Sequence, residues 1–532
     1  MRSFRSHLYE KDFVVTFELV PGRSTRTRRY RDIIGFAEKV AEDGLFDALS
    51  ITDNAGGHPA LAPEALGREL KRMGHEPIIH FSCKDKNRNK IESDLLALDR
   101  EGLHNLLILT GDYPRYGYRG RAKPVFDLDS VSLLRLISEM EKGFRLPPEV
   151  PGGGITLPPI PFFAGCVVNP FKWSEAETVT QYYKLIRKLR AGARFVITQV
   201  GFSARKFQEV KFFLEEEGFG EVPILGSILV MDVRLARLLY RGAVPGITVT
   251  ERLLKTVEAE ARRPDKGREA ALLRAAKLMA LLKGLGFQGA HICGAPLDLV
   301  AARELLAMAE EFYPSWKEFL PEFSEAPERS FFLYDRDPET DLNLRRRRDL
   351  SPRSVRSFTF LFSGLIHRLF FSSKAPFFRL TKSFFEKLSG SRFEKYLARL
   401  EYGFKKLLFD CQECGDCMLG ELAFLCPQSQ CAKYLLNGPC GGSQDGWCEV
   451  YSGKRRCVYV RIYERLSPEE RRKKLLENEI PPRNWALYRT SSWLNFYMGK
   501  DHHSFTDPPE ELEEARGSCP WKPQARRVAG VE

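Results

Sequence analysis

The chain has 532 residues, of which 43% are hydrophobic and 29% charged, a composition that fits a folded globular protein and excludes a disordered or fibrous one. This length is enough for one α/β barrel of about 250 residues and a smaller domain. The net charge of +12 favours anionic partners, such as phosphorylated or polycarboxylate ligands, nucleic acid or an acidic surface.

The N-terminal residues MRSFRSHLYEKDF contain no apolar segment of the kind found in secretory signals. The most apolar stretch of the second half, Phe358–Phe385, is interrupted by five basic residues, so we expect no membrane span. We therefore expect a cytoplasmic protein, in which cysteines stay reduced and bind metals more often than they form disulfides.

The first part of the chain alternates short apolar runs with longer amphipathic runs. Eight apolar runs predict strands: Phe13–Val20, Phe46–Thr52, Pro77–Cys83, Asn105–Thr110, Pro161–Val168, Ala193–Val200, Val222–Val230 and Gly289–Cys293. Helix-like stretches, such as Arg31–Asp43 and Ala270–Leu285, lie between them. About eight strand–helix units predict a closed (β/α)8 barrel rather than an open sheet.

Polar residues follow the ends of several of these strands. In such barrels the active site lies at the carboxyl ends of the strands. The residues found there are Glu18, Thr52, Asp53, Asn54, His80, Ser82, Thr110, Gly111, Asp112, Asn169 and Gln199. The alternation of side chains along a strand lets Glu18 and Asp112 both face the top of the barrel.

After the predicted barrel, residues 1–320, the pattern changes. Residues 321–354 predict a linker, whose run Arg345–Arg348 is more often a solvated face than an anion site. Residues 355–480 predict a cysteine-rich metal-binding domain that begins with a Phe-rich helical region. Within it, Lys454–Ile462 predicts a short strand and Ser467–Glu477 a helix that begins at Ser467. Residues 481–532 predict a poorly packed tail.

Five motifs on the predicted strand ends resemble methylenetetrahydrofolate reductases. They are FELVPGR (Phe17–Arg23), SITDNAGG (Ser50–Gly57), HFSC (His80–Cys83), LILTGDYP (Leu107–Pro114) and FVITQVGF (Phe195–Phe202). Members of this family use a bound flavin in a (β/α)8 barrel to reduce 5,10-methylenetetrahydrofolate to 5-methyltetrahydrofolate. The resemblance is carried by the order and spacing of the motifs, since each motif alone is weak.

The resemblance implies a role for each matching residue. Glu18 and Asp112 match the catalytic carboxyl groups. The substrate-binding positions match Glu18, Asp112 and Gln199. Flavin-binding positions match Thr52, His80, Thr110, Gly111, Asp112 and Asn169. An acid that protonates folate near neutral pH needs a raised pKa, so we expect partial burial to raise the pKa of Glu18.

Two residues depart from the family pattern. Asn169 stands where some reductases have a histidine, and Asp53 where bacterial enzymes have an aromatic residue, so the flavin can be FAD or FMN. The two residues matched to the catalytic carboxyl groups also have plain structural explanations. A Glu at a strand end, such as Glu18, is usually solvated when taken alone, and an Asp after Gly, such as Asp112, usually caps a helix or turn. The sequence contains no GxGxxG motif and no P-loop, so we expect no separate dinucleotide-binding domain.

Eight of the twelve cysteines lie in one short segment: Cys411, Cys414, Cys417, Cys426, Cys431, Cys440, Cys448 and Cys457. The Cys-x2-Cys-x2-Cys start followed by a distant fourth cysteine favours a [4Fe–4S] cluster, and zinc is the alternative. The first four form one predicted ligand set and the last four a second. The isolated Cys83, Cys166, Cys293 and Cys519 are expected to be small core or surface residues.

Residues 355–464, and above all Asn437–Gly442, resemble the metal-cluster subunit that accompanies this reductase in acetogenic bacteria. The resemblance implies that the C-terminal domain relays electrons or docks a redox partner. The expected electron donor is NADH, NADPH, ferredoxin or another redox-partner protein. The sequence leaves the oligomeric state open, and a homo-oligomer is one option.

Two other functions are alternatives to the reductase. One is a corrinoid or folate methyltransferase barrel, which needs no flavin. The other is a zinc protein that binds nucleic acid through Lys454–Arg456 and Arg471–Lys474, but the acidic residues around the second run weaken that interpretation. We therefore expect no nucleic-acid partner.

Overall fold

The computed structural model describes residues 3–146, 148, 153–294, 298–353, 355, 357–372 and 374–504. The chain divides into two compact units. The barrel unit combines Met1–Val355 with Cys431–Glu479, and the helical unit combines Arg356–Gln430 with Ile480–Glu532. This division differs from the predicted domain boundaries, because the second half of the cysteine segment belongs with the barrel. Cys519 and the last part of the predicted tail lie outside the described residues.

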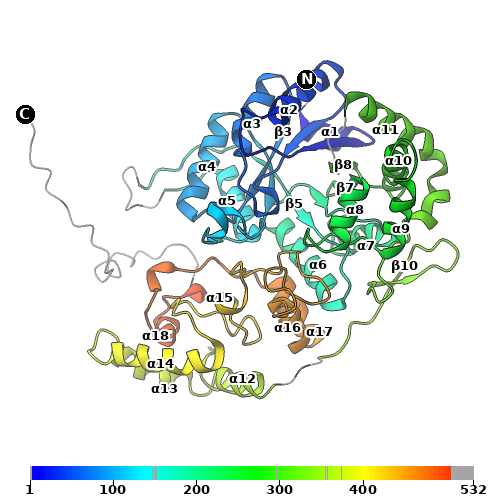
Figure 1. Ribbon diagram of the computed structural model, residues 1–532. Coiled ribbons are helices and arrows are strands. Elements are labelled where there is room, and N and C mark those ends of the chain that lie inside the picture. Colours follow the sequence, from blue (N-terminus) through cyan, green and yellow to red (C-terminus); the bar gives the residue numbers. More distant parts are fainter. Residues whose placement is uncertain are drawn as a thin grey trace, which may run out of the picture. The chain divides into compact units, whose positions relative to one another are not determined.

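Eight parallel strands form the closed barrel predicted from the sequence, in the order β1 to β8 with β8 paired to β1 (Figure 1). They are β1 (Val14–Leu19), β2 (Ala48–Ile51), β3 (Pro77–Ser82), β4 (Asn105–Leu109), β5 (Phe163–Val168), β6 (Val196–Thr198), β7 (Ile224–Val230) and β8 (Gly289–Gly294). Each predicted apolar run contains one of these strands, so the predicted (β/α)8 class is confirmed.

Helices surround the strands, and most begin at a residue whose side chain accepts a backbone hydrogen bond. They are α2 (Arg28–Asp43), α3 (Pro63–Arg72), α4 (Arg88–Arg100), α5 (Ser130–Lys142), α6 (Glu175–Arg190), α7 (Ala204–Glu216), α8 (Val233–Tyr240), α9 (Glu251–Glu260), α10 (Arg268–Gly284) and α11 (Leu299–Phe312). The short turns η1 (Ala55–Gly57), η2 (Gly117–Gly120) and η3 (Tyr313–Phe323) complete this part of the chain.

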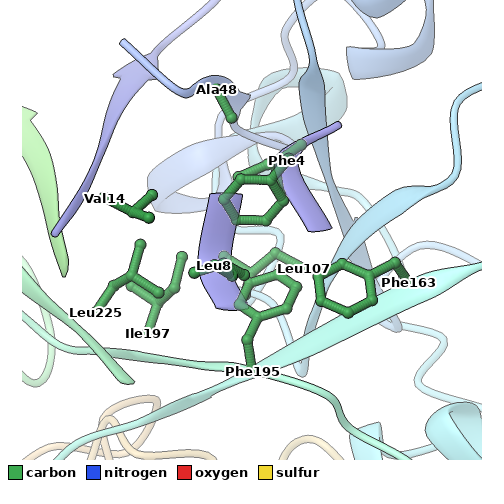
Figure 2. Packing of buried hydrophobic residues seen from close by; sticks show 10 residues of the cluster. Phe4, Leu8, Val14, Ala48, Leu107, Phe163, Phe195, Ile197 and Leu225 are labelled. Atoms are coloured by element: carbon green, nitrogen blue, oxygen red, sulfur yellow. The ribbon is translucent and has the colours of Figure 1, made fainter. Parts of the chain in front are cut away.

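The first helix, α1 (Phe4–Glu10), closes the amino end of the barrel. Its Phe4 and Leu8 are fully buried and pack in one cluster with residues from the starts of the strands, including Val14 and Leu225. Figure 2 shows the Phe4 ring among these side chains, and it meets the Phe195 ring edge to face at 5.4 Å. With this end filled by apolar side chains, the polar strand ends lie at the opposite face.

The segment Cys431–Glu479 packs against α6. It contains α16 (Val458–Arg465), α17 (Pro468–Arg471) and the π-helical turn η4 (Arg472–Glu477), and α16 and η4 both contact α6. The predicted strand at Lys454–Ile462 is wrong: its buried residues recur with helical spacing and form the inner face of α16. The predicted helix start at Ser467 is confirmed by a capping box with Glu470.

Residues predicted as a linker carry a small sheet. The strands β9 (Tyr334–Arg336) and β10 (Asn343–Arg347) pair antiparallel. The arginine run lies in and after β10, and its members form ion pairs with Glu215, Glu216 and Asp335. The run is therefore an ion-paired surface on this sheet.

The helical unit begins with the predicted Phe-rich helices α12 (Phe358–Phe370), α13 (Phe378–Leu388) and α14 (Glu394–Phe409). After the cysteine loop come α15 (Pro427–Gln430), η5 (Trp485–Leu487), α18 (Ser492–Tyr497) and η6 (His502–Ser504). Phe385, Leu494 and Tyr497 form its core, so the start of the predicted tail is folded. Among the described residues, no helix has the length and apolar character needed to cross a bilayer.

Candidate functional site

Glu18 meets two histidines at the carboxyl end of the barrel. Glu18 is the next-to-last residue of β1, His291 lies opposite Thr16 in β8, and His80 comes from β3. Their ligand atoms all lie within 4.8 Å of one another. His291 Nε2 is 3.8 Å from Glu18 Oε2, and its Nδ1 is 2.8 Å from Thr16 Oγ1. His80 Nε2 is 2.5 Å from Ser50 Oγ. The group combines one carboxyl with two imidazoles that other side chains orient.

These neighbours determine the ionisation of Glu18. Burial alone would raise its pKa, but the hydrogen bond and charge of His291, together with the charge of His80, lower it below the usual value. This differs from the predicted raised pKa, because the sequence analysis did not include His291. Burial also lowers the pKa of His80, to about 4. In the chain alone, Glu18 is therefore a carboxylate and His80 a neutral imidazole near pH 7.

The predicted residues of the β2, β3 and β4 ends lie together around this group. The Thr52 and Thr110 side chains are buried, with 6% and 7% exposed. Asp112 Oδ2 accepts the Gly56 N–H at 2.7 Å. Gly111 has a φ of +86°, and a Cβ there would lie 2.9 Å from Ser82 Cβ and from Lys84 Cδ, so the packing of its own chain requires glycine.

Asp53 and the two remaining predicted positions are engaged within the barrel unit. Asp53 Oδ2 accepts hydrogen bonds from the Ser82 amide and hydroxyl. Asn169 donates to the Gly246 and Gly441 carbonyls at 2.8 and 3.0 Å. Gln199 Oε1 accepts the Val200 N–H at 2.9 Å. Asn169 Oδ1 also accepts the Phe171 N–H at 3.1 Å, so all the polar atoms of this side chain already have partners within the chain, and the predicted contact with a flavin would need a further bond to Oδ1.

The run Asn437–Gly442 is held on the barrel by buried charged side chains. Lys184 of α6 donates to the Gly438 and Pro439 carbonyls at 3.2 and 3.1 Å. Asp129 accepts the Leu436 and Asn437 N–H groups at 3.1 and 2.8 Å. Every residue of α6 from Ala176 to Leu189 is buried, so its cations hold this segment rather than face solvent.

Lys433 and Lys172 link the second cysteine set to the barrel site. Lys433 donates to the Gly111 carbonyl at 2.7 Å and pairs with Glu449. Burial alone would lower the pKa of Lys433, but the charges of Glu449, Cys440 and Asp112 outweigh burial and raise it. Lys172 donates to the Gly441 carbonyl and, at 2.5 Å, to the Ser443 carbonyl. Cys440 therefore lies beside the strand ends that carry Asp112 and Asn169.

Comparison with known families identifies the barrel. Residues 3–298, more than half of the chain, match methylenetetrahydrofolate reductase, and residues 391–486 match the domain described as methylene-tetrahydrofolate reductase C terminal. The chain belongs to the methylenetetrahydrofolate reductase family. The family resemblance stated from the sequence motifs is thereby confirmed.

A search of curated proteins gave no match. Two of the similar solved structures illustrate the structural comparison. An uncharacterized protein from Clostridium thermocellum that binds two copies of 5-methyl-5,6,7,8-tetrahydrofolic acid has 15% identity and a TM-score of 0.41, and the alignment covers 58% of this chain and 98% of that one. A long-chain alkane monooxygenase has 11% identity and a TM-score of 0.36, with 57% and 92% covered. Neither similarity is strong enough to indicate function.

The C-terminal part of this reductase-family chain carries its two cysteine sets in different units. Cys431, Cys440, Cys448 and Cys457 belong to the barrel unit. Burial raises the pKa of Cys457, and the charges of Cys440 and Cys431 raise it further, which indicates that these sulfurs are neighbours. Cys411, Cys414, Cys417 and Cys426 belong to the helical unit. The two predicted ligand sets are thus two separate groups.

All four cysteines of the first set line one cavity of about 630 Å³. Five basic side chains line the same cavity: Lys395, Arg399, Lys405, Arg483 and Arg489. Burial alone would lower the pKa of Lys405, but the charges of Cys417 and Glu401 outweigh it and raise the pKa. Its volume leaves room for a group larger than a single ion, but its charge is mixed, because four acidic side chains also line it: Glu394, Glu401, Glu413 and Asp416.

Zinc sites and iron–sulfur clusters differ in how far apart they hold their cysteine sulfurs. A tetrahedral zinc site with Zn–S distances of about 2.3 Å places its sulfurs about 3.8 Å apart. Within the described part of the chain, the three groups of potential ligand atoms that lie within 4.8 Å of one another include no cysteine. A cubane cluster, in which each iron takes one thiolate, holds its sulfurs further apart.

Sequence reasoning missed His291 and Lys433. His291 lies in a predicted strand whose alternation places Gly289, His291 and Cys293 on one face, and that pattern alone could have identified an imidazole inside the barrel. Lys433 carries no such signal, because its role depends on how the cysteine segment folds back over β4.

Proposed function

We propose that the chain reduces 5,10-methylenetetrahydrofolate to 5-methyltetrahydrofolate with a bound flavin. The observation that carries this proposal is the Glu18–His291–His80 group at the open end of a barrel of the reductase family. A carboxyl next to an imidazole is suited to hold and transfer one proton, which the opening of the folate imidazolidine ring needs.

The strand ends fit a flavin by the chemistry of their donors. The residues that would hold it are Thr52, His80, Thr110 and the backbone at Gly111, which offer hydroxyl, imidazole and amide groups to the polar edge of the ring system. The bound flavin supplies the hydride. Asp112, fixed by the Gly56 amide, places a negative charge where a cationic folate intermediate is stabilised, and Gln199 lies at a second strand end for folate binding.

Proton transfer is assigned to Glu18 with His291 as its positioning residue. His291 is held toward Glu18 because its Nδ1 contacts the Thr16 hydroxyl at 2.8 Å. When folate binds and excludes water, the Glu18 carboxylate loses solvent stabilisation and takes up a proton, which it then delivers to N10. His80 stays neutral and adds no charge that would oppose this step.

For the C-terminal part we propose a [4Fe–4S] cluster in each cysteine set. When bound, the clusters supply one-electron transfer. Support for the first site comes from the cavity lined by all four of its cysteines, and for the second from Lys433 and Lys172, which connect the loop of Cys440 to the β4 and β5 ends. The second cluster would then pass electrons to the flavin site, and NAD(P)H, ferredoxin or another redox protein would serve as donor.

The decisive experiment uses the full chain purified without oxygen. We expect a bound flavin that is reduced by the donor and reoxidised by methylenetetrahydrofolate, with a Glu18→Gln variant that is reduced at the normal rate but reoxidised slowly. A colourless barrel without flavin would instead favour the methyltransferase alternative. Truncation before Cys431 is a poor test of the relay, because it would expose the buried cations of α6.

A further inference from the structure

A second group of potential metal ligands lies in the helical unit, and none of its members is a cysteine. Glu421 lies in the cysteine loop between Cys417 and Cys426, and His502 and His503 begin η6. Their ligand atoms all lie within 4.8 Å of one another. Asp416 and Asp501 lie directly behind the two histidines and complete the group.

Each imidazole is oriented through its Nδ1 by a carboxylate. His502 Nδ1 is 2.6 Å from Asp416 Oδ1, and His503 Nδ1 is 3.0 Å from Asp501 Oδ2. A carboxylate on one ring nitrogen fixes the tautomer and leaves the other nitrogen as a ligand, which is the arrangement found behind metal-binding histidines. Here it occurs twice, on adjacent residues.

The Nε2 atoms of both imidazoles point to the carboxylate of Glu421. His503 Nε2 is 2.9 Å from Glu421 Oε1, and His502 Nε2 is 3.9 Å from Glu421 Oε2. The second pair is too far apart for a hydrogen bond, and both of its atoms are buried without a partner. The His502 side chain is only 5% exposed. Two buried polar atoms that face each other across 3.9 Å leave a gap that a bound group could occupy.

We propose that Glu421, His502 and His503 bind one Zn²⁺ ion. Two imidazoles and one carboxylate are ligands that zinc accepts, and bonds of about 2.0–2.2 Å in a tetrahedron place ligand atoms about 3.3–3.6 Å apart. The two distances to Glu421 lie on either side of this range, so small side-chain movements would form the site. The fourth position is open toward solvent, because the His503 side chain is 40% exposed.

The ion would anchor the end of the described chain to the cysteine loop. Asp416 lies between Cys414 and Cys417 and also accepts the Asn484 and His502 backbone N–H groups. Zinc bound to His502 therefore holds η6 against the loop that supplies three cysteines of the first set. The site is distinct from both cysteine sets and does not depend on the proposed folate activity.

The test is zinc analysis of the full chain purified with its iron and flavin. We expect about one zinc per chain, and an X-ray absorption spectrum at the zinc edge with only nitrogen and oxygen neighbours at about 2.0–2.1 Å. His503→Gln should lose that zinc and keep its iron. His104→Gln is the matched control, since His104 also contacts a carboxylate, Asp99, at 2.9 Å but has no second histidine beside it; it should keep the zinc.

Two outcomes would overturn the proposal. One is zinc whose spectrum shows sulfur neighbours at about 2.3 Å, which would place the ion in a cysteine set. The other is equal zinc in the parent protein and in a folded His503→Gln variant. If that variant does not fold, the spectrum of the unmodified protein still decides, because a nitrogen and oxygen shell supports the site and a sulfur shell or absent zinc rejects it.

Discussion

His291 Nε2 lies 3.8 Å from Glu18 Oε2, and this contact between the last and first strands of the barrel governs the state of the proposed acid. Without the imidazole, the two interactions with His291 that lower the pKa of Glu18 are lost, while burial, which raises it, remains. We therefore expect His291→Asn to move the Glu18 ionisation to higher pH. The measurement is the pH profile of flavin reoxidation by methylenetetrahydrofolate in single turnovers. An unchanged profile would show that His291 does not act on Glu18.

Glu18→Gln should slow the same half-reaction by about 10²–10⁴-fold, the usual contribution of a positioned acid. The amide keeps the size of the side chain but holds no transferable proton, and the flavin site is not altered. Reduction of the flavin by the donor, which needs no acid at this position, is the internal control and should stay at the normal rate. Normal reoxidation in the fully loaded variant would contradict the proposed role.

His80 should make the barrel less stable in mild acid. Its pKa is about 4 in the folded chain against an ordinary value of 6.5, so between these values the unfolded chain binds a proton that the folded chain does not. Stability is therefore lost as pH falls through this window, by about 2 kcal/mol between pH 7 and pH 5. Urea unfolding at both pH values should show this loss, and His80→Gln should reduce it. Equal pH dependence in the two proteins would mean that His80 is protonated when folded.

Lys184→Met should destabilise the barrel unit by about 1–3 kcal/mol for each buried carbonyl left without its donor. The variant leaves Asp129 without its cation and the Gly438 and Pro439 carbonyls without a donor. Lys211→Met is the matched control, because Lys211 also donates to a carbonyl, that of Gly286, but its side chain is 26% exposed. We expect the control to cost less than about 1 kcal/mol in urea unfolding. Equal losses would mean that burial of Lys184 adds nothing.

The sequence was sufficient for the barrel because its strands are short and almost fully buried, so each appears as a continuous apolar run. It failed where tertiary packing reverses a local pattern. Lys184 and its neighbours on α6 have the composition of a solvated face, yet the cysteine segment covers them. The β-branched run in α16 has strand-like composition but helical burial. Glu18 was found from its motif, whereas its ionisation depends on His291, 273 residues away in the chain.

The division of the cysteines between two units predicts two independent clusters. The full chain should hold about eight iron atoms, and Cys414→Ser and Cys440→Ser should each lose about four of them. Each variant should lose only the iron of its own cysteine set, because the two sets belong to different units. Cys166→Ala is the control, since Cys166 is a buried cysteine of β5 outside both sets. Iron analysis with electron paramagnetic resonance of the reduced proteins gives the count and the cluster type.

Flavin reduction then distinguishes a relay from a structural cluster. If electrons reach the flavin through the second set, Cys440→Ser should slow reduction by the donor while reoxidation by folate, which uses Glu18, stays unchanged. The loop of Cys440 contacts the β5 end through Asn169, so flavin content must be measured in the same variant. Normal donor reduction in a variant that keeps its flavin but has lost the second cluster would exclude the relay and leave direct reduction by NAD(P)H.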